Sequence, residues 1–199
     1  MMRVAVVDAG GANLGSVAYA LQRLGIAPEI TASARALRAA DRVVLPGVST
    51  AATVMRRLRA LDLVETLREL RVPLLGVCVG MQLLFEHSEE DDTPCLGLLP
   101  GRVARLAEAP GVRVPHMGWN TLEPLSAAPL AEGIGAGERA YFVHSYAAPV
   151  TADCVLACTH GRRFAAAVQR GHVAGVQFHP ERSAAVGARV LRNFLEMQA

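Results

Sequence analysis

Apolar residues in the first half of the chain follow two alternating patterns, which predict strands followed by helices. Three short apolar runs rich in β-branched residues predict strands: residues 3–7, 42–45 and 72–77. Apolar residues at three- and four-residue spacing predict helices over residues 14–24, 55–67 and 81–86. The run 72–77 has no polar side chain, so we expect it at the centre of a parallel sheet, buried on both faces.

Local signals predict where these elements end. We expect Asn13 to cap the first helix and Gly25 to end it. The pair Pro46-Gly47 is expected to end the second strand, and the helical stripe 55–67 to break near Asp62. The acidic run 89–92 is expected to form a solvated loop.

The second half of the chain has a different character, with frequent proline and glycine over residues 93–137. Five short apolar runs predict strands: residues 102–106, 140–143, 154–157, 164–168 and 173–178. A last amphipathic helix is predicted over residues 186–195. The whole pattern predicts an α/β fold in a single domain over residues 1–199. Its mostly parallel central sheet is flanked by helices, and antiparallel strands are added in the second half.

Composition excludes several classes of protein. Apolar residues make up 52% of the 199 residues and charged residues 19%, which is enough for a sizeable core. The formal net charge of +2 gives no electrostatic basis for binding nucleic acid. All 20 basic residues are Arg, which excludes a Walker A phosphate loop and a lysine Schiff base. No apolar run is long enough for a membrane helix and the first residues lack a signal-peptide pattern, so we expect a cytoplasmic protein.

The four cysteines do not have the spacing of a metal site or a disulfide framework. They are Cys78, Cys95, Cys154 and Cys158, and they form no CxxC pair. A domain this apolar does not need disulfides for stability. We therefore expect no metal site, and we expect Cys154 and Cys158 to be buried thiols that act as small apolar side chains.

One cysteine lies in the pattern of a nucleophile elbow. Cys78 follows the buried run and has a glycine two residues before it and another two residues after it, Gly76 and Gly80. A tight turn between a strand and a helix needs such glycines, because side chains there would clash. The turn would display the thiol at the carboxyl end of the sheet and direct the N–H of Val79 toward an oxyanion. Taken alone, the pattern fits equally well a buried cysteine at the end of a glycine-rich strand.

A nucleophilic thiol needs a base, and among the six histidines His179 has the most informative surroundings. Pro180 favours an extended backbone at His179, in which residues two apart point to the same side. Glu181 can then accept the N–H of the imidazole and leave the other ring nitrogen free to face Cys78. His-Pro-Glu alone is more often a surface turn, but both features at strand ends in one chain favour a Cys-His-Glu triad.

These motifs resemble those of the class I glutamine amidotransferases, which hydrolyse the side-chain amide of glutamine and pass the ammonia to a synthase. The segments that carry the likeness are Gly76-Val-Cys-Val-Gly-Met-Gln82 and Gly175-Val-Gln-Phe-His-Pro-Glu181. Further segments resemble, in order and spacing, the glutaminase subunits of imidazole glycerol phosphate synthase: residues 8–17, 46–48, 114–120 and 141–146. The likeness covers nearly the whole chain. It implies a flavodoxin-like amidotransferase fold and no metal or organic cofactor.

The resemblance also implies a role for individual residues. Cys78 would be the nucleophile, His179 the base and later the acid, and Glu181 the residue that orients the imidazole. The N–H groups of Val48 and Val79 would form the oxyanion hole, with a peptide flip needed at Val48. The glutamine substrate would be held by Gly47, Gln82, Ser145 and Tyr146.

A partner is implied as well. It would be the cyclase subunit of the synthase, a (β/α)8 barrel that receives ammonia through a tunnel in a heterodimer. The barrel would make imidazole glycerol phosphate and aminoimidazole carboxamide ribotide, in histidine biosynthesis. The residues expected to face it are Asn13, Pro115, His116, Met117, Trp119, Asn120 and Arg182. Trp119 is the only tryptophan, and we expect it to anchor the contact.

The sequence departs from the family's motifs at three positions. Ala9 and Ala12 replace an aromatic residue and a glycine of the first motif, and Ser49 replaces the last glycine of the oxyanion strand. Because serine has a Cβ and tolerates positive φ poorly, the change at Ser49 bears on the flip at Val48.

Three alternative functions stay open at the level of sequence. The first is a glutaminase of another synthase, above all pyridoxal phosphate synthase, to whose motif Pro46-Gly-Val-Ser-Thr50 is faintly similar. The others are a catalytically silent docking module and a cysteine hydrolase or peptidase on a similar fold. Pro115-His-Met-Gly-Trp-Asn120 argues against the first, and the complete triad argues against the silent module.

Overall fold

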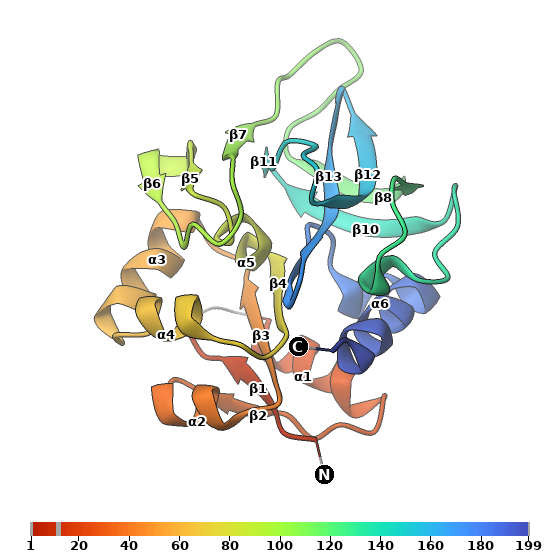
Figure 1. Ribbon diagram of the computed structural model, residues 1–199. Helices are drawn as coiled ribbons and strands as arrows, with labels where there is room; N and C mark the ends of the chain where they lie inside the picture. The colour runs from red at the N-terminus through yellow and green to blue at the C-terminus, as the bar shows by residue number, and fades with distance from the viewer. Residues whose placement is uncertain (1, 11–12, 199) are drawn as a thin grey trace.

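An eight-stranded sheet forms the centre of the computed structural model, which describes residues 2–10 and 13–198 (Figure 1). Ala12 of the first motif lies outside the described residues. Five neighbouring strands run parallel, in the order β2 (Glu29–Thr31), β1 (Val4–Val7), β3 (Arg42–Gly47), β4 (Leu74–Cys78) and β14 (Val173–Val176). Antiparallel strands then extend the sheet: β13 (Arg162–Arg170), β12 (Cys154–His160) and β9 (Glu123–Pro124). The predicted parallel sheet with antiparallel additions is confirmed.

Helices cover both faces of this sheet (Figure 1). On one side lie α1 (Leu14–Gln22) and α6 (Ala184–Glu196), and on the other lie α2 (Ala34–Ala39), α3 (Ala51–Ala60) and α4 (Val64–Glu69). The break predicted near Asp62 is confirmed, since Asp62 has a φ of 53° between α3 and α4. Gly25 follows α1 with a φ of 82°, the left-handed conformation in which glycine commonly ends a helix.

Strand β4 occupies the centre of the sheet, between β3 and β14. All of its residues are buried, as the absence of polar side chains predicts. The parallel register of β3 and β4 places Gly47 beside Cys78. The elbow therefore lies at the carboxyl edge of the sheet, where open α/β sheets commonly bind ligands.

Two smaller sheets lie beyond this edge (Figure 1). One pairs β8 (His116–Thr121) with β10 (Arg139–His144), and the other has the order β11 (Tyr146–Ala147), β7 (Arg102–Arg105), β5 (His87–Ser88) and β6 (Thr93–Pro94). Single 3-10 turns occur at η1 (Glu90–Asp92), η2 (Pro129–Ala131) and η3 (Pro180–Arg182). These sheets supply the second wall of the site.

Three expectations about element ends are wrong. β3 continues through Pro46 and Gly47, because these residues pair alongside Val77 and Cys78 of β4. The helix predicted over residues 81–86 is a single turn, α5 (Val79–Gln82), which begins at the elbow. Asn13 precedes α1 without capping it, because its side chain makes no capping hydrogen bond.

Several elements were not predicted at all. β2 has no buried residue and α2 buries only Leu37, so no apolar period marks either of them. Strand β8 lies in the motif over residues 114–120, which we had interpreted only as a partner contact. The remaining additions are strands of two residues, which are too short to show a pattern.

The cysteines and the surface agree with composition. All four cysteines are free and buried, and burial raises the pKa of Cys95 and Cys154 to about 11 and that of Cys158 to about 12.

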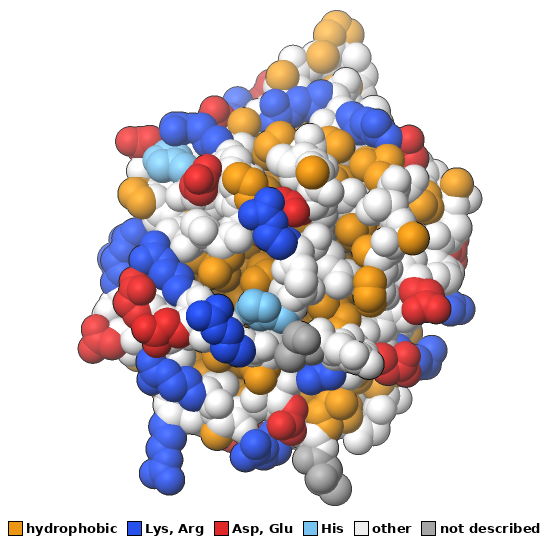
Figure 2. Space-filling view, in the orientation of Figure 1, with side chains coloured by type: hydrophobic (Ala, Val, Ile, Leu, Met, Phe, Trp, Pro, Cys, Tyr) orange, Lys and Arg blue, Asp and Glu red, His pale blue; other side chains and the backbone are white. Residues whose placement is uncertain are grey.

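Arginine and acidic side chains are interspersed on the face shown in Figure 2, in keeping with the net charge of +2. None of the helices in residues 2–10 and 13–198 combines the length and the apolar character that a membrane crossing requires.

Candidate active site

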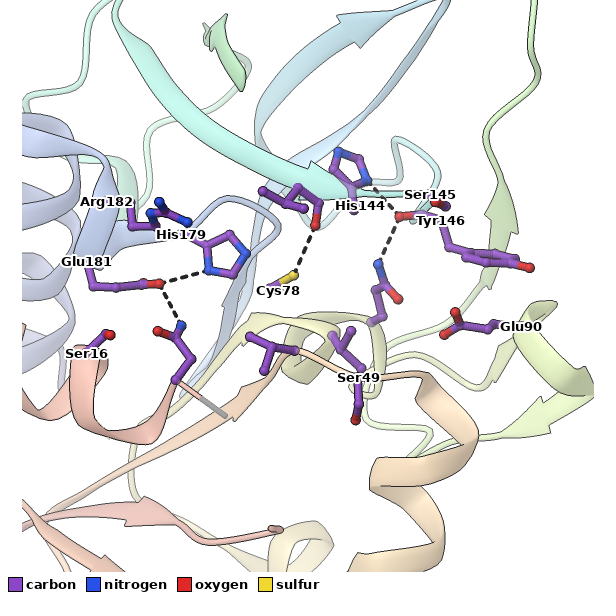
Figure 3. A pocket seen from close by; sticks show the side chains of 15 residues that line it. Ser16, Ser49, Cys78, Glu90, His144, Ser145, Tyr146, His179, Glu181 and Arg182 are labelled. Carbon is purple, nitrogen blue, oxygen red and sulfur yellow. Dashed lines mark hydrogen bonds and ion pairs between the residues drawn. The ribbon is translucent and has the colours of Figure 1, made fainter. Parts of the chain in front are cut away.

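A cavity of about 470 Å³ lies where the ends of β3 and β4 meet the smaller sheets (Figure 3). The predicted site residues that line it are Asn13, Val48, Cys78, Val79, Gln82, Ser145, Tyr146, His179, Glu181 and Arg182. Ser16, Ser49, Glu90, Val143 and His144 line it too, although none of them had been predicted as a site residue. Gly47 lies against its wall, since a Cβ at this position would be 3.0 Å from the Cβ of Val79.

Cys78 has the strained backbone of a nucleophile elbow. Its φ is 56° and its ψ is −114°, a backbone conformation that residues other than glycine rarely adopt. A Cβ on Gly76 would be 2.5 Å from the carbonyl oxygen of Gly80, and a Cβ on Gly80 would be 1.8 Å from that of Leu45. Both glycines are therefore required by close backbone contacts, and the predicted tight turn is confirmed.

His179 and Glu181 are hydrogen-bonded to one another. The Nδ1 of His179 lies 2.9 Å from the Oε1 of Glu181, and both side chains are almost fully buried. The extended backbone predicted at His179 is confirmed, but it does not by itself bring Glu181 to the imidazole. His179 is extended, with φ −94° and ψ 98°, but Pro180–Arg182 form the 3-10 turn η3, and this turn brings Glu181 to the imidazole.

Asn13 completes this group from the start of α1. Its Nδ2 donates to the Oε1 of Glu181 over 2.7 Å, so that one carboxylate oxygen accepts from both Asn13 and His179 (Figure 3). We had predicted Asn13 only at the partner contact. Sequence spacing gave no sign of a hydrogen bond between residues 168 positions apart.

Neighbouring groups favour the charged forms of this pair. Burial raises the pKa of Glu181, but the hydrogen bonds from His179 and Asn13 outweigh it, so the pKa lies below its usual range. Burial likewise lowers the pKa of His179, but Cys78 and Glu181 beside it raise it to about 10. A protonated imidazole next to a cysteine is the arrangement that supplies a thiolate nucleophile.

Gln82 is held by two hydrogen bonds inside the protein. Its Nε2 donates to the carbonyl oxygen of Tyr146 over 2.9 Å and to the Oε1 of Gln177 over 3.0 Å. The Nε2 of Gln177 in turn lies 3.8 Å from the Sγ of Cys78. The side chain of Gln82 is therefore fixed in the cavity wall, and Gln177 connects it to the thiol of Cys78.

The segment that ends β3, with Val48 of the proposed oxyanion hole, has an ordinary backbone at Ser49, where the family's motif has glycine. Val48 and Ser49 follow β3 and line the cavity, as Val79 does. Neither is among the described residues that have a positive φ. Ser49 therefore avoids, in this conformation, the strain that its Cβ would meet in the left-handed region.

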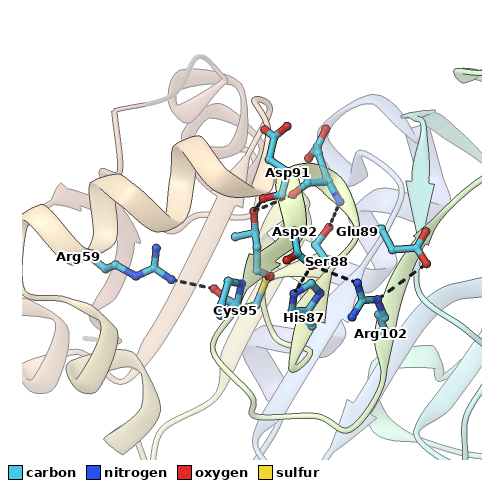
Figure 4. A network of polar contacts seen from close by, with 11 residues as sticks. Arg59, His87, Ser88, Glu89, Asp91, Asp92, Cys95 and Arg102 are labelled. Atoms are coloured by element: carbon cyan, nitrogen blue, oxygen red, sulfur yellow. Dashed lines mark hydrogen bonds and ion pairs between the residues drawn. The ribbon is translucent and has the colours of Figure 1, made fainter.

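Side chains of the acidic run 89–92 make ion pairs and hydrogen bonds within the protein (Figure 4). Asp92 pairs with Arg102 at 3.3 Å and with His87 at 3.1 Å, while Glu90 accepts the N–H of Ala51 over 2.7 Å. Burial raises the pKa of Glu90, although the Ala51 N–H lowers it in part. The solvated-loop prediction is wrong for Glu90, which places a carboxylate on the cavity wall.

The segment predicted to face a partner has two different sides. Met117 and Trp119 are 64% and 45% exposed, whereas His116 between the sheets is only 4% exposed. Because side chains alternate along strand β8, His116 and Asn120 point away from the exposed side, and the Nδ2 of Asn120 lies 3.1 Å from the Nε2 of His116. Pro115 is exposed at the start of the strand. The expectation that His116 faces a partner is thus wrong for its side chain.

Trp119 belongs to a small exposed group. Its ring meets that of Tyr141 edge-on at 6.0 Å, and the guanidinium of Arg182 lies 4.8 Å from the centre of the Tyr141 ring. Tyr141 lies directly opposite Trp119 in the β8–β10 pair. Arg182 lines the cavity as well, so the exposed group adjoins the rim of the site.

Comparison with known sequences gives a consistent result. Residues 5–197 match the family described as glutamine amidotransferase class-I. The chain is 63% identical to the imidazole glycerol phosphate synthase subunit HisH of Xylella fastidiosa strain Temecula1, over the full length of both proteins. It is 61% identical to the subunit HisH of Xanthomonas axonopodis pv. citri, over 99% of this chain and 98% of that protein.

Solved structures share the fold at lower identity. A crystal structure of a glutamine amidotransferase has a TM-score of 0.77 at 23% identity and covers 97% of each chain. The structure of PurLQS from Thermotoga maritima has a TM-score of 0.72 at 21% identity and covers 98% of each chain. These structures show that the arrangement of sheet and helices is the one seen here.

Proposed function

The chain belongs to the class I glutamine amidotransferase family, among the HisH subunits of imidazole glycerol phosphate synthase, and on that premise we propose how its residues hydrolyse glutamine. One observation carries the proposal. Cys78, with its strained backbone, lines the same cavity as His179. The imidazole of His179 is hydrogen-bonded to Glu181 over 2.9 Å. Nucleophile, base and orienting carboxylate are the parts that amide hydrolysis by a thiol requires.

The first half of the reaction forms a thioester. The Sγ of Cys78 attacks the side-chain amide carbon of glutamine, and the carbonyl electrons move onto oxygen. The N–H of Val79 and, after the peptide flip, the N–H of Val48 receive this oxyanion, and both residues line the cavity. His179 then gives its proton to the amide nitrogen, the C–N bond breaks and ammonia leaves.

The second half restores the enzyme. A water molecule attacks the thioester carbon while His179 takes a proton from it, and the C–S bond breaks to release the thiolate. Glutamine and water are thus converted into glutamate and ammonia. Glu181 keeps its proton-free form throughout, in accordance with its lowered pKa, and stabilises the imidazolium of His179.

Four residues are proposed to hold the amino-acid end of glutamine: Gly47, Gln82, Ser145 and Tyr146. All but Gly47 line the cavity, and Gly47 supports its wall at Val79. We add Glu90, whose carboxylate on the cavity wall suits the α-ammonium group of an amino acid.

Ammonia released into water at neutral pH becomes protonated, and the ammonium ion is not a nucleophile. Ammonia must therefore reach its acceptor without entering the solvent. This requirement supports a docked partner, which we propose to be the cyclase subunit of the synthase, a (β/α)8 barrel. The exposed group of Met117, Trp119, Tyr141 and Arg182 adjoins the cavity rim and is the proposed contact. Pyridoxal phosphate synthase is not favoured as the acceptor enzyme, because the close relatives bear the HisH name.

Covalent labelling tests the catalytic proposal directly. A chloroketone analogue of glutamine should form an S–C bond with Cys78 and release chloride, so that the intact mass rises by one adduct. Cys78→Ala should show no adduct and no glutamate release, with or without the cyclase subunit. Cys95→Ala is the matched control, because it removes another buried thiol and should label like the wild type.

Each outcome discriminates between functions. Glutamate release by Cys78→Ala would refute the assignment of the nucleophile. A wild type that neither labels nor hydrolyses glutamine, even with the cyclase subunit, would point to a silent docking module. Labelling of Cys78 together with release that rises when the cyclase subunit is added would support both the triad and the partner.

A further inference from the structure

A continuous chain of hydrogen bonds connects strand β8 with the cavity wall. Asn120 contacts His116 at 3.1 Å, His116 contacts His144 at 2.9 Å, and His144 contacts the carbonyl oxygen of Tyr146 at 2.8 Å. The same carbonyl accepts the Nε2 of Gln82 (Figure 3). We propose that His116 and His144 are positioning residues for glutamine binding, because they fix the Tyr146 carbonyl and, through it, Gln82; this inference rests on the proposed function.

The groups at the two ends of this series of hydrogen bonds, the Tyr146 carbonyl and the Asn120 amide, determine which atom donates in each one. The Tyr146 carbonyl can only accept, so the Nδ1 of His144 donates to it and the Nε2 of a neutral His144 accepts. His116 must then donate from Nδ1 and accept at Nε2 from Asn120. The amide of Asn120 has this orientation for independent reasons, since its Nδ2 also donates to the Thr159 carbonyl and its Oδ1 accepts from the N–H of Thr121.

Both histidines are held in place by burial and by aromatic neighbours. His144 is 6% exposed and His116 is 4% exposed. The His116 ring is stacked between Phe142, at 4.9 Å, and His160, at 4.1 Å. Burial lowers the pKa of His116 to about 4 and that of His144 to about 3, which supports the neutral forms that the chain of donors requires.

The inner end of the chain acts on the cavity through Gln82. Both N–H bonds of its amide are used within the protein, one on the Tyr146 carbonyl and one on Gln177. Its carbonyl oxygen is therefore the polar group that Gln82 can offer to a substrate. A displaced Tyr146 carbonyl would free one N–H and allow the amide to turn.

The outer end of the chain lies on the strand that presents Met117 and Trp119. These two side chains point outward from β8, whereas His116 and Asn120 point inward. Residues 116–120 do not line the cavity, although β8 pairs with β10, whose Val143 and His144 do. The hydrogen-bonded histidines add a link from the side chains of β8 to the Tyr146 carbonyl.

Inhibition kinetics with the chloroketone analogue of glutamine test the proposal, because they separate binding (KI) from the rate of labelling (kinact). In His144→Leu, we expect KI to rise about tenfold, as for the loss of one buried hydrogen bond, with kinact within about twofold of the wild type. His144→Asn keeps a donor close to the position of Nδ1 and should restore most of the affinity. His172→Leu is the matched control, since it removes a histidine whose side chain is hydrogen-bonded to the Leu70 carbonyl and does not line the cavity, and KI should not change.

Three results would overturn the proposal: a KI for His144→Leu equal to that of His172→Leu, no rescue by His144→Asn, or a loss confined to kinact. If His144→Leu does not fold by circular dichroism, His116→Leu replaces it. That variant keeps the His144–Tyr146 hydrogen bond and should raise KI by about threefold, and an unchanged KI would refute the role. Failure of the wild type to label at Cys78 would instead refute the proposed function, so the two failures are distinct.

Discussion

A single carboxylate oxygen of Glu181 accepts hydrogen bonds from His179 and Asn13, and this oxygen determines how the imidazole is held. A carboxylate with two donors is well fixed, and charge-assisted hydrogen bonds are about twice as strong as neutral ones. Asn13 therefore belongs to the triad's support as much as to any partner contact.

Replacing Asn13 by Ala should slow the labelling of Cys78 by about five- to tenfold at neutral pH, because Glu181 loses one of its two donors. The pKa of Glu181 is lowered in part by Asn13, so its loss should also move the acid limb of the labelling rate to higher pH. The measurement is the labelling rate between pH 4 and pH 8, which is about the range of carboxyl and imidazole titration. Asn193→Ala removes a comparable amide far from the site and should change neither quantity.

His116 and His144 should make the fold sensitive to acid. Their pKa values in the fold are about 4 and about 3, below the value of about 6.5 expected in the unfolded chain. The unfolded chain therefore binds protons first as the pH falls, and the free energy of unfolding decreases from about pH 6.5 downward. His160 faces His116, and His116, His160 and His179 face His144; protonation of any of these groups opposes protonation of its neighbour.

Urea unfolding at pH 7 and pH 5 checks this expectation. Each of the two histidines should contribute a loss of about 2 kcal/mol between these values. His144→Asn removes one titrating group, so its loss between the same two values should be smaller by about that amount. Equal losses in the variant and the wild type would show that His144 is not held neutral by the fold.

At the scale of elements, helix α6 packs directly on the backbone of η3 and so fixes the position of Glu181 in the proposed triad. A Cβ on Gly187 would be 1.9 Å from the carbonyl oxygen of Pro180, the residue between His179 and Glu181. Gly187→Ala should therefore push η3 away, lower the free energy of unfolding by about 1–3 kcal/mol and slow the labelling of Cys78.

The matched control is Gly15→Ala in α1. Its Cβ would meet only a ring carbon of Tyr19, at 3.9 Å. Because alanine favours helix more than glycine does, this change should raise the free energy of unfolding by about 1 kcal/mol. Urea unfolding of both variants should give effects of opposite sign, and a stable, fully reactive Gly187→Ala would contradict the close contact.

The same distinction between local and long-range contacts explains what the sequence could predict. The buried run before Cys78 and the glycines around it act within a few residues, so the strand and the tight turn that carries Cys78 were predictable. The break near Asp62 in the helical stripe over residues 55–67 was predictable for the same reason. Asn13 with Glu181, Glu90 with Ala51, and His116 with His144 were not, because each pair is joined by the tertiary fold and has no shared sequence period.

At the scale of the whole molecule, the cavity lies between the large central sheet and the two smaller sheets. The parallel strands supply Cys78, the proposed nucleophile, and Val48 of the proposed oxyanion hole. The smaller sheets supply Tyr146, His144 and the exposed face of β8. A partner on that exposed face would contact the layer that closes the cavity, and would leave the large sheet untouched. The proposed docking surface and the proposed glutamine site would therefore meet in one antiparallel pair of strands, β8 with β10.

Trp119→Ala is the variant that tests this arrangement. Trp119 is 45% exposed beside Met117 and packs on Tyr141, so it has the size and position of an interface anchor. Its loss should weaken the binding of the cyclase subunit by about thirtyfold, which corresponds to about 2 kcal/mol, as measured by calorimetry. Ile30→Ala is the control, since Ile30 is 44% exposed on the opposite edge strand β2 and its replacement should leave the affinity unchanged.

The free Trp119→Ala subunit should also label at Cys78 as fast as the wild type, because the side chain points away from the histidines and from the cavity. An unchanged affinity for the cyclase subunit would place the docking surface elsewhere on the molecule. Slower labelling of the free subunit would show that the outer and inner sides of β8 are coupled even without a partner. In that case the strand itself, and not the docked subunit, would set how well the site is assembled.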